Sequence, residues 1–345
     1  MRLKVSVTAA VFCLAAVFSG MPALALDPIS QQSGFSGYIQ PGFGYLNIKS
    51  NMVAKVVSFD LSEEKIGDVD EEPDSESTAI FTLPFKLAYT FAGSRTEVFF
   101  GTEVSDLLTF DVSQQLGVKQ GIGSLGVVQA GLLFSGATRV WKDPYVEDRD
   151  RDDTSRRNVG AKLVWDKVFG SGLELEYAIR SIDIGSEKSG DFLGLTGSRK
   201  DRLDRNGTTH QAAAGYALKF GGKHTLTPQV AFFYEDLDGQ AMANTGVDLM
   251  LTYLYAGDPV TLVFNGYVGQ ADFDKSNPIY GKTRDDDRYG ASVAVYYKNP
   301  WGWTLFGSEP MQFFATGAYY GVDSNIDFYN QEAILGMGGV AFRWK

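Results

Sequence analysis

The chain has 345 residues and is acidic, with 42 Asp and Glu against 31 Lys and Arg and a formal net charge of -11. This charge excludes nucleic acid as an expected partner, because a phosphate backbone is bound by clustered cations. The single cysteine, Cys13, falls in the leader described next, so the rest of the chain is expected to contain no disulfide and no cysteine metal site.

The N-terminus has the pattern of a cleaved secretory signal peptide. Arg2 and Lys4 precede an apolar run over residues 5–18, and a small-residue cleavage site follows. A membrane anchor is the alternative, but the run is short for a span and no second apolar helix follows it. We expect residues 1–25 to be removed and residues 26–345 to form a single domain, whose formal net charge becomes -13 once Arg2 and Lys4 are lost.

From about residue 35 onward, apolar and polar side chains alternate with a period of two, which predicts β-strands with one apolar face. The pattern is clear at residues 173–180 and 289–298 and again in the last segment, 334–345. In an earlier segment, one face carries a continuous apolar row: Phe81, Leu83, Phe85, Leu87, Tyr89 and Phe91. Helical periodicity is scarce, so the chain is expected to be all-β.

The connections between these segments alternate between short and long. Tight turns are predicted at residues 92–95, 169–172, 221–224 and 256–259, and longer polar loops at residues 49–77, 142–158, 183–207 and 272–287. This asymmetry is typical of bacterial outer-membrane β-barrels, which have short periplasmic turns and long extracellular loops. We therefore predict a transmembrane antiparallel β-barrel of about 14 strands, or about 12 if the weak link at residues 105–107 is not a turn.

A soluble β-sandwich or barrel is the alternative, since alternation alone does not say which face is inside. The loop asymmetry and the aromatic residues near segment ends favour the membrane barrel, because aromatic girdles mark the two membrane interfaces. The girdle candidates are Tyr45, Phe91, Trp141, Trp165, Phe220, Tyr255, Tyr297 and Trp344.

Three prolines conflict with a closed barrel. Pro41, Pro84 and Pro228 fall inside predicted strands, where a missing N–H removes a hydrogen bond of the ladder. Bulges near the rim are the simpler explanation. A lateral opening of the wall is the alternative at Pro41 and Pro84, because these two lie on neighbouring strands.

The last segment resembles the C-terminal signal that the barrel-assembly machinery of Gram-negative bacteria recognises. Gly339, Phe342 and Trp344 carry the resemblance, although Lys345 follows the final aromatic residue. The resemblance implies the assembly machinery as a partner. With the signal peptide, it implies an outer-membrane location after secretory export, in contact with lipid and lipopolysaccharide.

Several strings also resemble a proteobacterial outer-membrane family that is classed only as a domain of unknown function. They include GFSGYIQPGFGY, LPFKLAYTF, WKDPYV and SNPIYGKTRDDDRYGA, and together they cover residues 34–329. The resemblance implies a place in the cell envelope and a porin-like barrel. It implies no activity and no ligand.

If the apolar faces meet lipid, the opposite faces line the lumen, and both charge signs are present there. Such a lining either braces the wall through ion pairs or lines a passage for polar solutes. About 14 strands lie between filled and open barrels, and many lumen positions are Gly or Ala, which favours a channel. The charged lumen candidates are Lys86, Glu97, Glu103, Lys162, Asp166, Glu174, Glu176, Arg180, Lys219, Asp248, Lys298 and Arg343.

The loops concentrate the negative charge. Residues 49–77 contain nine acids and three lysines, which indicates either an acidic extracellular mouth that attracts cations or simply a solvated loop. The loops at residues 147–157, 199–205 and 282–288 mix both signs, and their arginines are suited to lipopolysaccharide phosphates or to pairing across the mouth.

Asp148, Asp150 and Asp152 have the alternate-carboxylate spacing of calcium loops. Asp153 and Val159 stand where an EF-hand needs glycine and glutamate, so an EF-hand is excluded. A loop-type cation site remains as a minor alternative.

The sequence contains no recognisable catalytic motif, and we expect no cofactor. After the leader, the chain has two histidines, His210 near a predicted extracellular rim and His224 in a tight turn, and no nucleophile motif accompanies them. We therefore expect a non-enzymatic channel for small polar or amphiphilic solutes. The alternatives are a structural or adhesion barrel that binds partners through its loops and, less favoured, an outer-membrane hydrolase. The solute and the oligomeric state are left open.

Overall fold

The computed structural model describes residues 26, 28–103 and 113–345. The predicted signal peptide, residues 1–25, and the link at residues 105–107 lie outside the described residues. Within the described part, no helix is both long and apolar enough to span a membrane.

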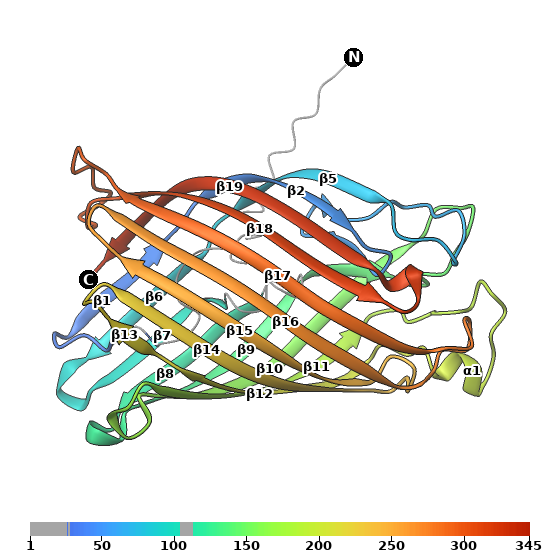
Figure 1. Ribbon diagram of the computed structural model, residues 1–345, viewed down its shortest axis with the longest axis horizontal. Helices are drawn as coiled ribbons and strands as arrows, with labels where there is room; N and C mark the ends of the chain where they lie inside the picture. Colours follow the sequence, from blue (N-terminus) through green and yellow to red (C-terminus); the bar gives the residue numbers. More distant parts are fainter. Residues whose placement is uncertain (1–25, 27, 104–112) are drawn as a thin grey trace, which may run out of the picture.

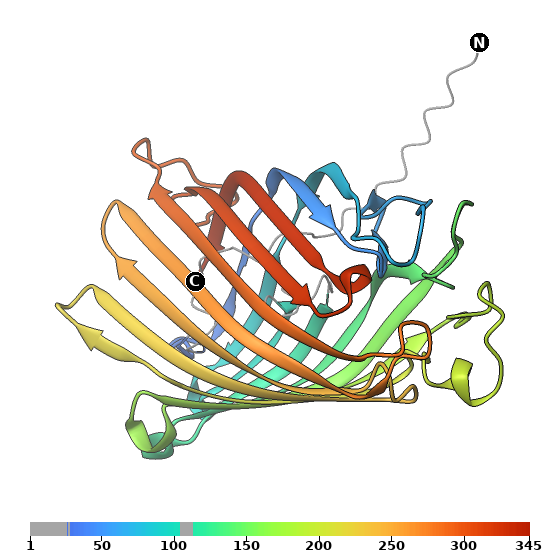
Figure 2. The ribbon, with the colours of Figure 1, turned by 45° about the vertical axis from the view of Figure 1, so that its right-hand side comes forward.

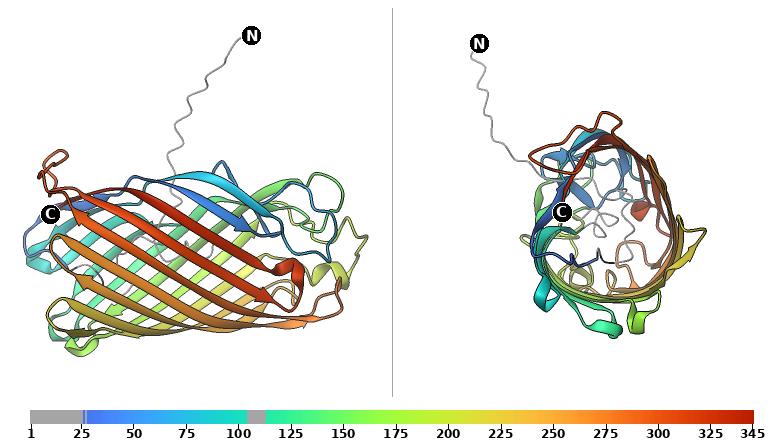
Figure 3. Two further views of the ribbon diagram at one scale, coloured as in Figure 1. Left: turned by 45° about the horizontal axis from the view of Figure 1, so that its top comes forward. Right: turned by 90° about the vertical axis from the view of Figure 1, so that its left-hand side faces the viewer.

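The described strands form one closed antiparallel barrel (Figures 1 and 3). Its wall contains fourteen strands, so the predicted number is confirmed and 12 is excluded. The last strand pairs with the first over its whole length, with Trp344 opposite Gly37 and Glu332 opposite Lys49, and this pairing closes the wall. In chain order the wall strands are β1 (Gly34–Ile39) continued by β2 (Gly42–Lys49), β5 (Ser75–Thr82) continued by β6 (Phe85–Phe91), β7 (Thr96–Glu103), β8 (Ser113–Gly121), β9 (Val127–Trp141), β10 (Asp153–Asp166), β11 (Leu173–Ile184), β12 (Gly207–Tyr216) continued by β13 (Leu218–Phe220), β14 (His224–Leu237), β15 (Asn244–Ala256), β16 (Val260–Ser276), β17 (Thr283–Lys298), β18 (Gln312–Ser324) and β19 (Gln331–Trp344).

The two ends of the barrel differ in their connections (Figure 2). The turn end holds the C-terminus and the predicted tight turns, with the short helices η1 (Ala92–Ser94), η3 (Gly123–Leu125) and η4 (Val168–Gly170). The loop end holds the longer connections, with α1 (Ser198–Asp201) and η5 (Asp327–Tyr329). In outer-membrane barrels the turn end faces the periplasm, so the loop end is the extracellular one.

Two connections depart from the prediction. Residues 299–311 form a long connection at the turn end, and its Trp301, Trp303 and Phe306 side chains are exposed. The predicted loop at residues 272–287 is shorter than expected, because β16 and β17 continue to pair as far as Ser276 and Thr283. Its run of charges belongs mostly to strands.

A hairpin from the first long loop completes the wall near the loop end. Strand β3 (Val53–Val56) pairs with β9 from Thr138 to Val140, on the loop-end side of Ser135, where the described part of β8 pairs with β9. Strand β4 (Phe59–Asp60) pairs with β3 and contacts β5. Ala54 and Val56 of this hairpin are completely buried. The wall between β5 and β9 therefore depends on β7 and β8 at the turn end and on the hairpin at the loop end.

The prolines neither bulge the wall nor open it. The pairing between the first two strands keeps one register on both sides of the break, with Ile39 opposite Phe85 and Gly42 opposite Thr82. Pro84 accepts a hydrogen bond from Gln40 N at 2.8 Å, and Pro41 accepts one from Val340 N at 3.1 Å. Each proline loses one donor and keeps its acceptor, so both the predicted bulges and the lateral opening at Pro41 and Pro84 are wrong.

Pro228 is also in register, opposite Leu251 of β15. On its other side, the ladder between β14 and the preceding strand is interrupted between β12 and β13. The missing N–H of Pro228 coincides with this interruption, so the barrel accommodates it by a short gap in hydrogen bonding instead of a bulge.

The outward face of the wall is apolar, as a lipid-facing surface requires. Phe43, Leu132 and Phe232 are each more than half exposed. Aromatic clusters lie on this face, including Tyr177 with His210 and Tyr234, and Phe220 with His224 and Tyr255. The closed barrel, its apolar belt and its unequal ends together identify the architecture of an outer-membrane barrel.

Among the predicted girdle residues, Trp141 is the exception. It is 1% exposed, its Nε1 donates to Ser62 Oγ at 3.0 Å, and the guanidinium of Arg151 lies 4.4 Å from its ring centre. The side chain is covered by the loop residues Ser62 and Arg151 at the loop end, so it is buried under loops and has no exposed girdle position.

Candidate functional site

One side of the lumen is lined by ion pairs between neighbouring strands. Glu97 of β7 lies between Lys86 of β6 and Lys119 of β8, with Nζ to Oε1 distances of 3.0 Å and 3.6 Å. Both ammonium groups also lie over the Phe99 ring, 5.4 Å and 5.6 Å from its centre. All of these positions face inward because they alternate with the exposed apolar residues of the same strands.

A second group continues this lining. Lys162 of β10 lies between Glu103 of β7 and Glu176 of β11, at 3.3 Å and 3.0 Å. The two groups together, Lys86, Glu97, Lys119, Glu103, Lys162 and Glu176, form what we term the charged wall, and their side chains are buried or nearly so. Buried ions of one sign would be costly, so the alternation of Lys and Glu is what makes this lining possible.

The other predicted lumen residues fall into two sets. Asp166, Glu174, Arg180 and Asp248 also lie on inward-facing positions, and Asp248 pairs with Arg288 at 3.5 Å. Lys219, Lys298 and Arg343 lie at the turn-end rim, where Lys219 and Lys298 are exposed and Lys298 pairs loosely with Asp258 at 3.7 Å. Five of the six residues of the charged wall were therefore predicted, all but Lys119, and the rim lysines lie apart from it.

The opposite side of the lumen is apolar. Inward side chains of β2, β5, β17, β18 and β19 form one buried cluster with Val56 and Leu61 of the β3–β4 hairpin. We term this side the apolar wall; its strand members include Leu46, Ile48, Ile80, Phe314, Leu335 and Met337. The lumen thus presents ions on one side and hydrocarbon on the other.

At the loop end, six connections meet in a packed cap. Its buried side chains come from loops at residues 50–74, 142–152, 185–206, 238–243, 277–282 and 325–330. At its centre, Tyr145, Phe328 and Tyr329 are completely buried and their rings contact one another. The loops therefore fold over the barrel mouth and do not simply extend into solvent.

Hydrogen bonds fix this centre. The hydroxyl groups of Tyr145 and Tyr329 lie 2.6 Å apart, Asn277 Nδ2 donates to Tyr329 Oη at 2.7 Å, and Tyr280 Oη donates to the Val69 carbonyl at 2.9 Å. Burial in this apolar setting raises the pKa of Tyr145, Tyr280 and Tyr329, because a phenolate there would lose its hydration.

Arg151 adds a cation beneath the cap. Its Nη1 donates to the carbonyls of Asn51 and Pro144, both at 3.2 Å. Burial lowers its pKa to about 10. Its loop contacts link the first long loop to the loop at residues 142–152.

A chamber of about 260 Å³ lies in the lumen near the cap. Its lining comes from the β3 hairpin, from strands β9 to β11 and β14 to β19, and from cap residues such as Met242. The lining combines apolar side chains with Arg156, Arg205, Arg284 and Arg288. The chamber therefore lies inside the barrel, next to the cap.

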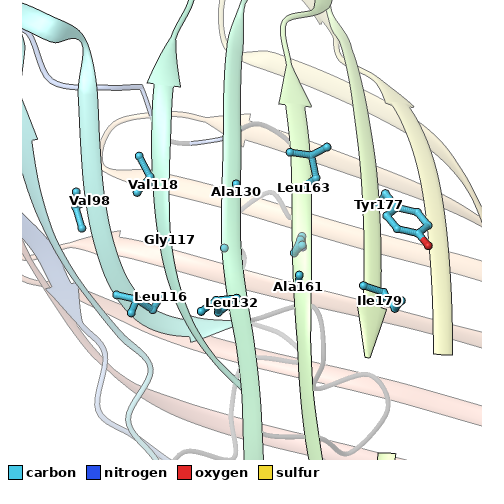
Figure 4. Close-up of a pocket in the computed structure, with 12 residues that line it drawn as sticks. Val98, Leu116, Gly117, Val118, Ala130, Leu132, Ala161, Leu163, Tyr177 and Ile179 are labelled. Atoms are coloured by element: carbon cyan, nitrogen blue, oxygen red, sulfur yellow. The ribbon is translucent and has the colours of Figure 1, made fainter. Parts of the chain in front are cut away.

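A larger hollow lies on the outer surface of the wall (Figure 4). Small side chains such as Ala130 and Ala161 form its floor, between Leu116, Leu132 and Leu163. These residues belong to the outward apolar face, so lipid acyl chains fill the hollow in a membrane. It is a feature of the lipid-facing surface, separate from the lumen.

The predicted loop aspartates do not gather into a cluster of metal ligands within the described residues. In the described part of the chain, no three His, Cys, Asp or Glu side chains come together as metal ligands. Asp152 pairs with Lys142 at 3.3 Å, and Asp148 and Asp150 take no part in such a cluster. The cation site at Asp148, Asp150 and Asp152 therefore finds no support. In the acidic loop, most of the carboxylates are exposed while Ile66 and Val69 are buried in the cap.

The predicted assembly residues lie on the closing strand. Phe342 and Trp344 occupy outward positions of β19, and Trp344 Nε1 donates to the Phe306 carbonyl at 3.2 Å. At Gly339 a Cβ atom would lie 2.2 Å from the Pro41 carbonyl oxygen, so only glycine fits this position.

The histidines occupy the lipid-facing surface. His210 Nδ1 lies 2.8 Å from Tyr177 Oη, and His224 Nδ1 lies 2.8 Å from Tyr253 Oη. Both imidazoles also stack on neighbouring aromatic rings of the outward clusters. This setting is that of interfacial residues at a membrane boundary.

Sequence reasoning missed several interior charges. Leu116 and Val118 are exposed on the outward face of β8, so the period of two places Lys119 on the inward face. This alternation was a signal that could have identified Lys119. Arg284, Asp286 and Arg288 were assigned to a mixed-charge extracellular loop, yet their even spacing marks one face of a strand. A run of charges hides this spacing because both faces are polar.

A family model described as "Protein of unknown function (DUF2860)" matches residues 34–343. The chain belongs to this family. The match confirms the resemblance seen in the sequence. None of the curated proteins compared with the chain matches it.

Solved outer-membrane structures are similar to this DUF2860 barrel at low identity. A Pseudomonas aeruginosa FadL homologue has a TM-score of 0.42 at 11% identity, covering 96% of this chain and 94% of the other. A loop L8 deletion mutant of OmpT, an outer-membrane protein of Vibrio cholerae, has a TM-score of 0.41 at 12% identity, covering 90% and 99%. An anion-selective porin from Comamonas acidovorans has a TM-score of 0.37 at 10% identity, covering 91% and 100%.

Proposed function

We propose that the barrel is an outer-membrane channel for small amphiphilic solutes, closed at rest by its extracellular cap. The observation that carries the proposal is the two-sided lumen, with the charged wall on β6 to β11 and the apolar wall on β2, β5 and β17 to β19. A solute with a polar and an apolar part finds a matching surface on each side. A barrel needed only as a membrane anchor has no use for such a lining.

The cap explains why passage needs an opening step. Its centre is an apolar, hydrogen-bonded cluster drawn from six loops, and loops are the parts of a barrel that move most readily. Opening requires that Phe328 and Tyr329 leave Tyr145, Asn277 and Tyr280, and the strands of the wall can stay in place. We propose that the exposed acids of residues 49–77 then give the open mouth a preference for small cations.

The test is conductance of the purified full chain in planar bilayers. We expect rare, stepwise openings with a modest preference for potassium over chloride. The comparison is a variant that lacks the tip of the loop at residues 325–330, which removes Phe328 and Tyr329 from the cap and should open for most of the time. Silence of both proteins would refute the channel while leaving the fold intact.

A structural or adhesion barrel is the second candidate, and the order of the cap favours it. Several loop cations already have partners within the protein: Arg199 Nη2 donates to the Pro278 carbonyl at 3.0 Å, and Arg149 lies 4.7 Å from the Phe192 ring centre. The cap therefore presents a fixed surface to lipopolysaccharide or to another cell. Loss of surface binding after loop replacement, with unchanged permeability, would support this candidate over the channel.

A role in assembly is proposed for the closing strand. Phe342 and Trp344 face lipid, and Gly339 permits the close pairing with β2, so the three are available to the barrel-assembly machinery before closure. Hydrolysis is not proposed, because His210 pairs with Tyr177 on the outward face, away from the lumen.

A further inference from the structure

The chamber near the cap contains a buried donor that has no hydrogen-bond partner among the described residues. Arg205 is 7% exposed and lines the chamber. Its Nε and Nη2 donate to Glu187 at 2.6 Å and 3.1 Å, and Nη2 also donates to the Trp141 carbonyl at 2.7 Å. Its Nη1 is buried and finds no acceptor in the part of the chain that the structure describes. Leaving a buried charged donor unpaired costs roughly 1–3 kcal/mol or more, so an acceptor within reach of Nη1 would be stabilising.

The charges around the chamber are arranged to favour an anion. Arg156, Arg205, Arg284 and Arg288 are lining residues, against Glu235 and Asp286. The carboxylates that neutralise Arg205 and Arg288, which are Glu187 and Asp248, do not line the chamber. The lining therefore carries more guanidinium than carboxylate groups, and two of its four arginines have their counter-charges outside the lining.

The rest of the lining is hydrocarbon. Val140, Ile182 and Ile184 form a buried apolar cluster with Leu237, and all four line the chamber. Phe273 adds an aromatic face, over which Arg284 lies 4.4 Å from the ring centre. An inorganic anion would leave these surfaces without contacts, so the ligand needs an apolar body.

The volume limits the size of that body. A dry apolar cavity of about 150 Å³ holds one benzene molecule, so a chamber of about 260 Å³ accepts on the order of ten non-hydrogen atoms. The acids of residues 49–77 do not line the chamber, so they do not set its preference.

We infer that the chamber is a binding site for a small apolar carboxylate, whose carboxylate is held at the Arg205 side and whose hydrocarbon part lies against the Val140 and Ile182 side. This inference deepens the proposed function by naming the class of solute. The binding step itself does not require that the solute passes through the barrel.

The experiment is calorimetric titration of the full chain, refolded in lipid nanodiscs, with benzoate. Benzyl alcohol, benzylamine and acetate test the need for negative charge and for an apolar body, and empty nanodiscs correct for partition into lipid. We expect saturable benzoate binding that is at least tenfold tighter than binding of any of the three analogues. Absence of saturable binding, or equal affinity for benzylamine, would overturn the inference.

Location is tested by filling the chamber. An Arg205→Ala variant risks disordering the cap, because it leaves the nearly buried Glu187 without its cation. Ala271 is a buried lining residue of β16, and Ala271→Phe should weaken benzoate binding at least tenfold. Ala161→Phe, on the outward face, is the matched control and should bind as the unmodified chain does.

Unchanged benzoate affinity in Ala271→Phe, with the barrel folded, would place the site elsewhere and contradict the inference. Binding without conductance in bilayers would refute the channel and keep the site. Conductance without benzoate binding would refute the binding site and keep the channel. The two proposals can therefore fail separately.

Discussion

The charged wall and the cap are both buried and both contain polar groups, yet they are held together differently. In the charged wall, full charges from β6 to β11 are fixed on rigid strands, and each Glu or Lys is neutralised by a neighbour. In the cap, loops meet through aromatic rings and neutral hydroxyl groups, with few full charges at the centre. The wall is suited to stay in place and the cap to come apart.

The energetic consequence follows from desolvation. Removing one member of a buried ion group leaves the others without compensation, which is costly, whereas removing one hydroxyl from the cap loses a single modest hydrogen bond. Mutations in the wall should therefore act on the stability of the barrel, and mutations in the cap on how often it opens.

The largest effect is expected from Lys162→Met. The substitution leaves Glu103 and Glu176 buried without their shared cation, which should lower the free energy of unfolding by about 3–5 kcal/mol. Urea unfolding in lipid vesicles, followed by tryptophan fluorescence, measures it. Lys219→Met, at the exposed rim, is the control and should change stability by less than about 0.5 kcal/mol.

A combined Lys162→Met, Glu103→Gln and Glu176→Gln variant should recover most of the lost stability, because no uncompensated charge remains. If Lys162→Met were as stable as the unmodified barrel, water would be compensating the two glutamates, and the charged wall would be a hydrated lining. Mutations in the wall would then not differ from mutations in the cap in their effect on stability.

A double Phe328→Ala and Tyr329→Ala variant should have the next largest effect, and on opening instead of stability. Both side chains are completely buried at the cap centre, and their removal leaves a cavity among the loops. The open probability in planar bilayers should rise on the order of tenfold, with the urea midpoint nearly unchanged. Phe306→Ala, an exposed aromatic residue at the turn end, should alter neither quantity.

The sequence predicted the wall far better than the cap, for physical reasons. Alternation with a period of two is imposed by every strand that separates lipid from lumen, so the strand number and the inward positions of Glu97, Lys162 and Glu176 could be inferred from the chain. The cap has no period. Tyr145, Asn277 and Tyr329 are brought together by the closure of the barrel, and none of their local sequences indicates burial.

The same difference explains the errors. Arg284, Asp286 and Arg288 were assigned to a loop because they lie in a run of charges, and the exposed Asp285 and Asp287 between them masked the strand. Pro41 and Pro84 suggested bulges because the rule that a proline removes a ladder hydrogen bond considers only the strand that contains the proline. Their carbonyls keep the ladder intact through Val340 and Gln40 on other strands.

Alkaline pH should loosen the cap before the wall. Burial raises the pKa of Tyr145, Tyr280 and Tyr329 above the ordinary value of 10.0, so the cap favours their neutral form. Their contribution to stability is fully present below pH 10 and is lost as the pH rises towards the folded-state values. Open probability should increase a few-fold between pH 8 and pH 11, on the order of threefold.

A Tyr145→Phe, Tyr280→Phe and Tyr329→Phe variant is the control for this pH effect. It should open slightly more often at pH 8, because it lacks the hydroxyl contacts, and its open probability should not rise further at pH 11. An unchanged alkaline response in this variant would assign the effect to other groups.

The smallest effect is expected from the acids of the first long loop. Converting Asp68, Asp70, Glu71, Glu72 and Asp74 to their amides removes charges that are exposed and separate from the chamber lining. The preference for potassium over chloride should fall by about twofold in 0.1 M salt and by less in 1 M salt, because exposed charges are screened over about 10 Å and 3 Å respectively. Benzoate affinity should stay the same, since the arginines of the chamber set it. A large loss of affinity would show that loop charge reaches the interior, and the cap would then be part of the binding site as well as its cover.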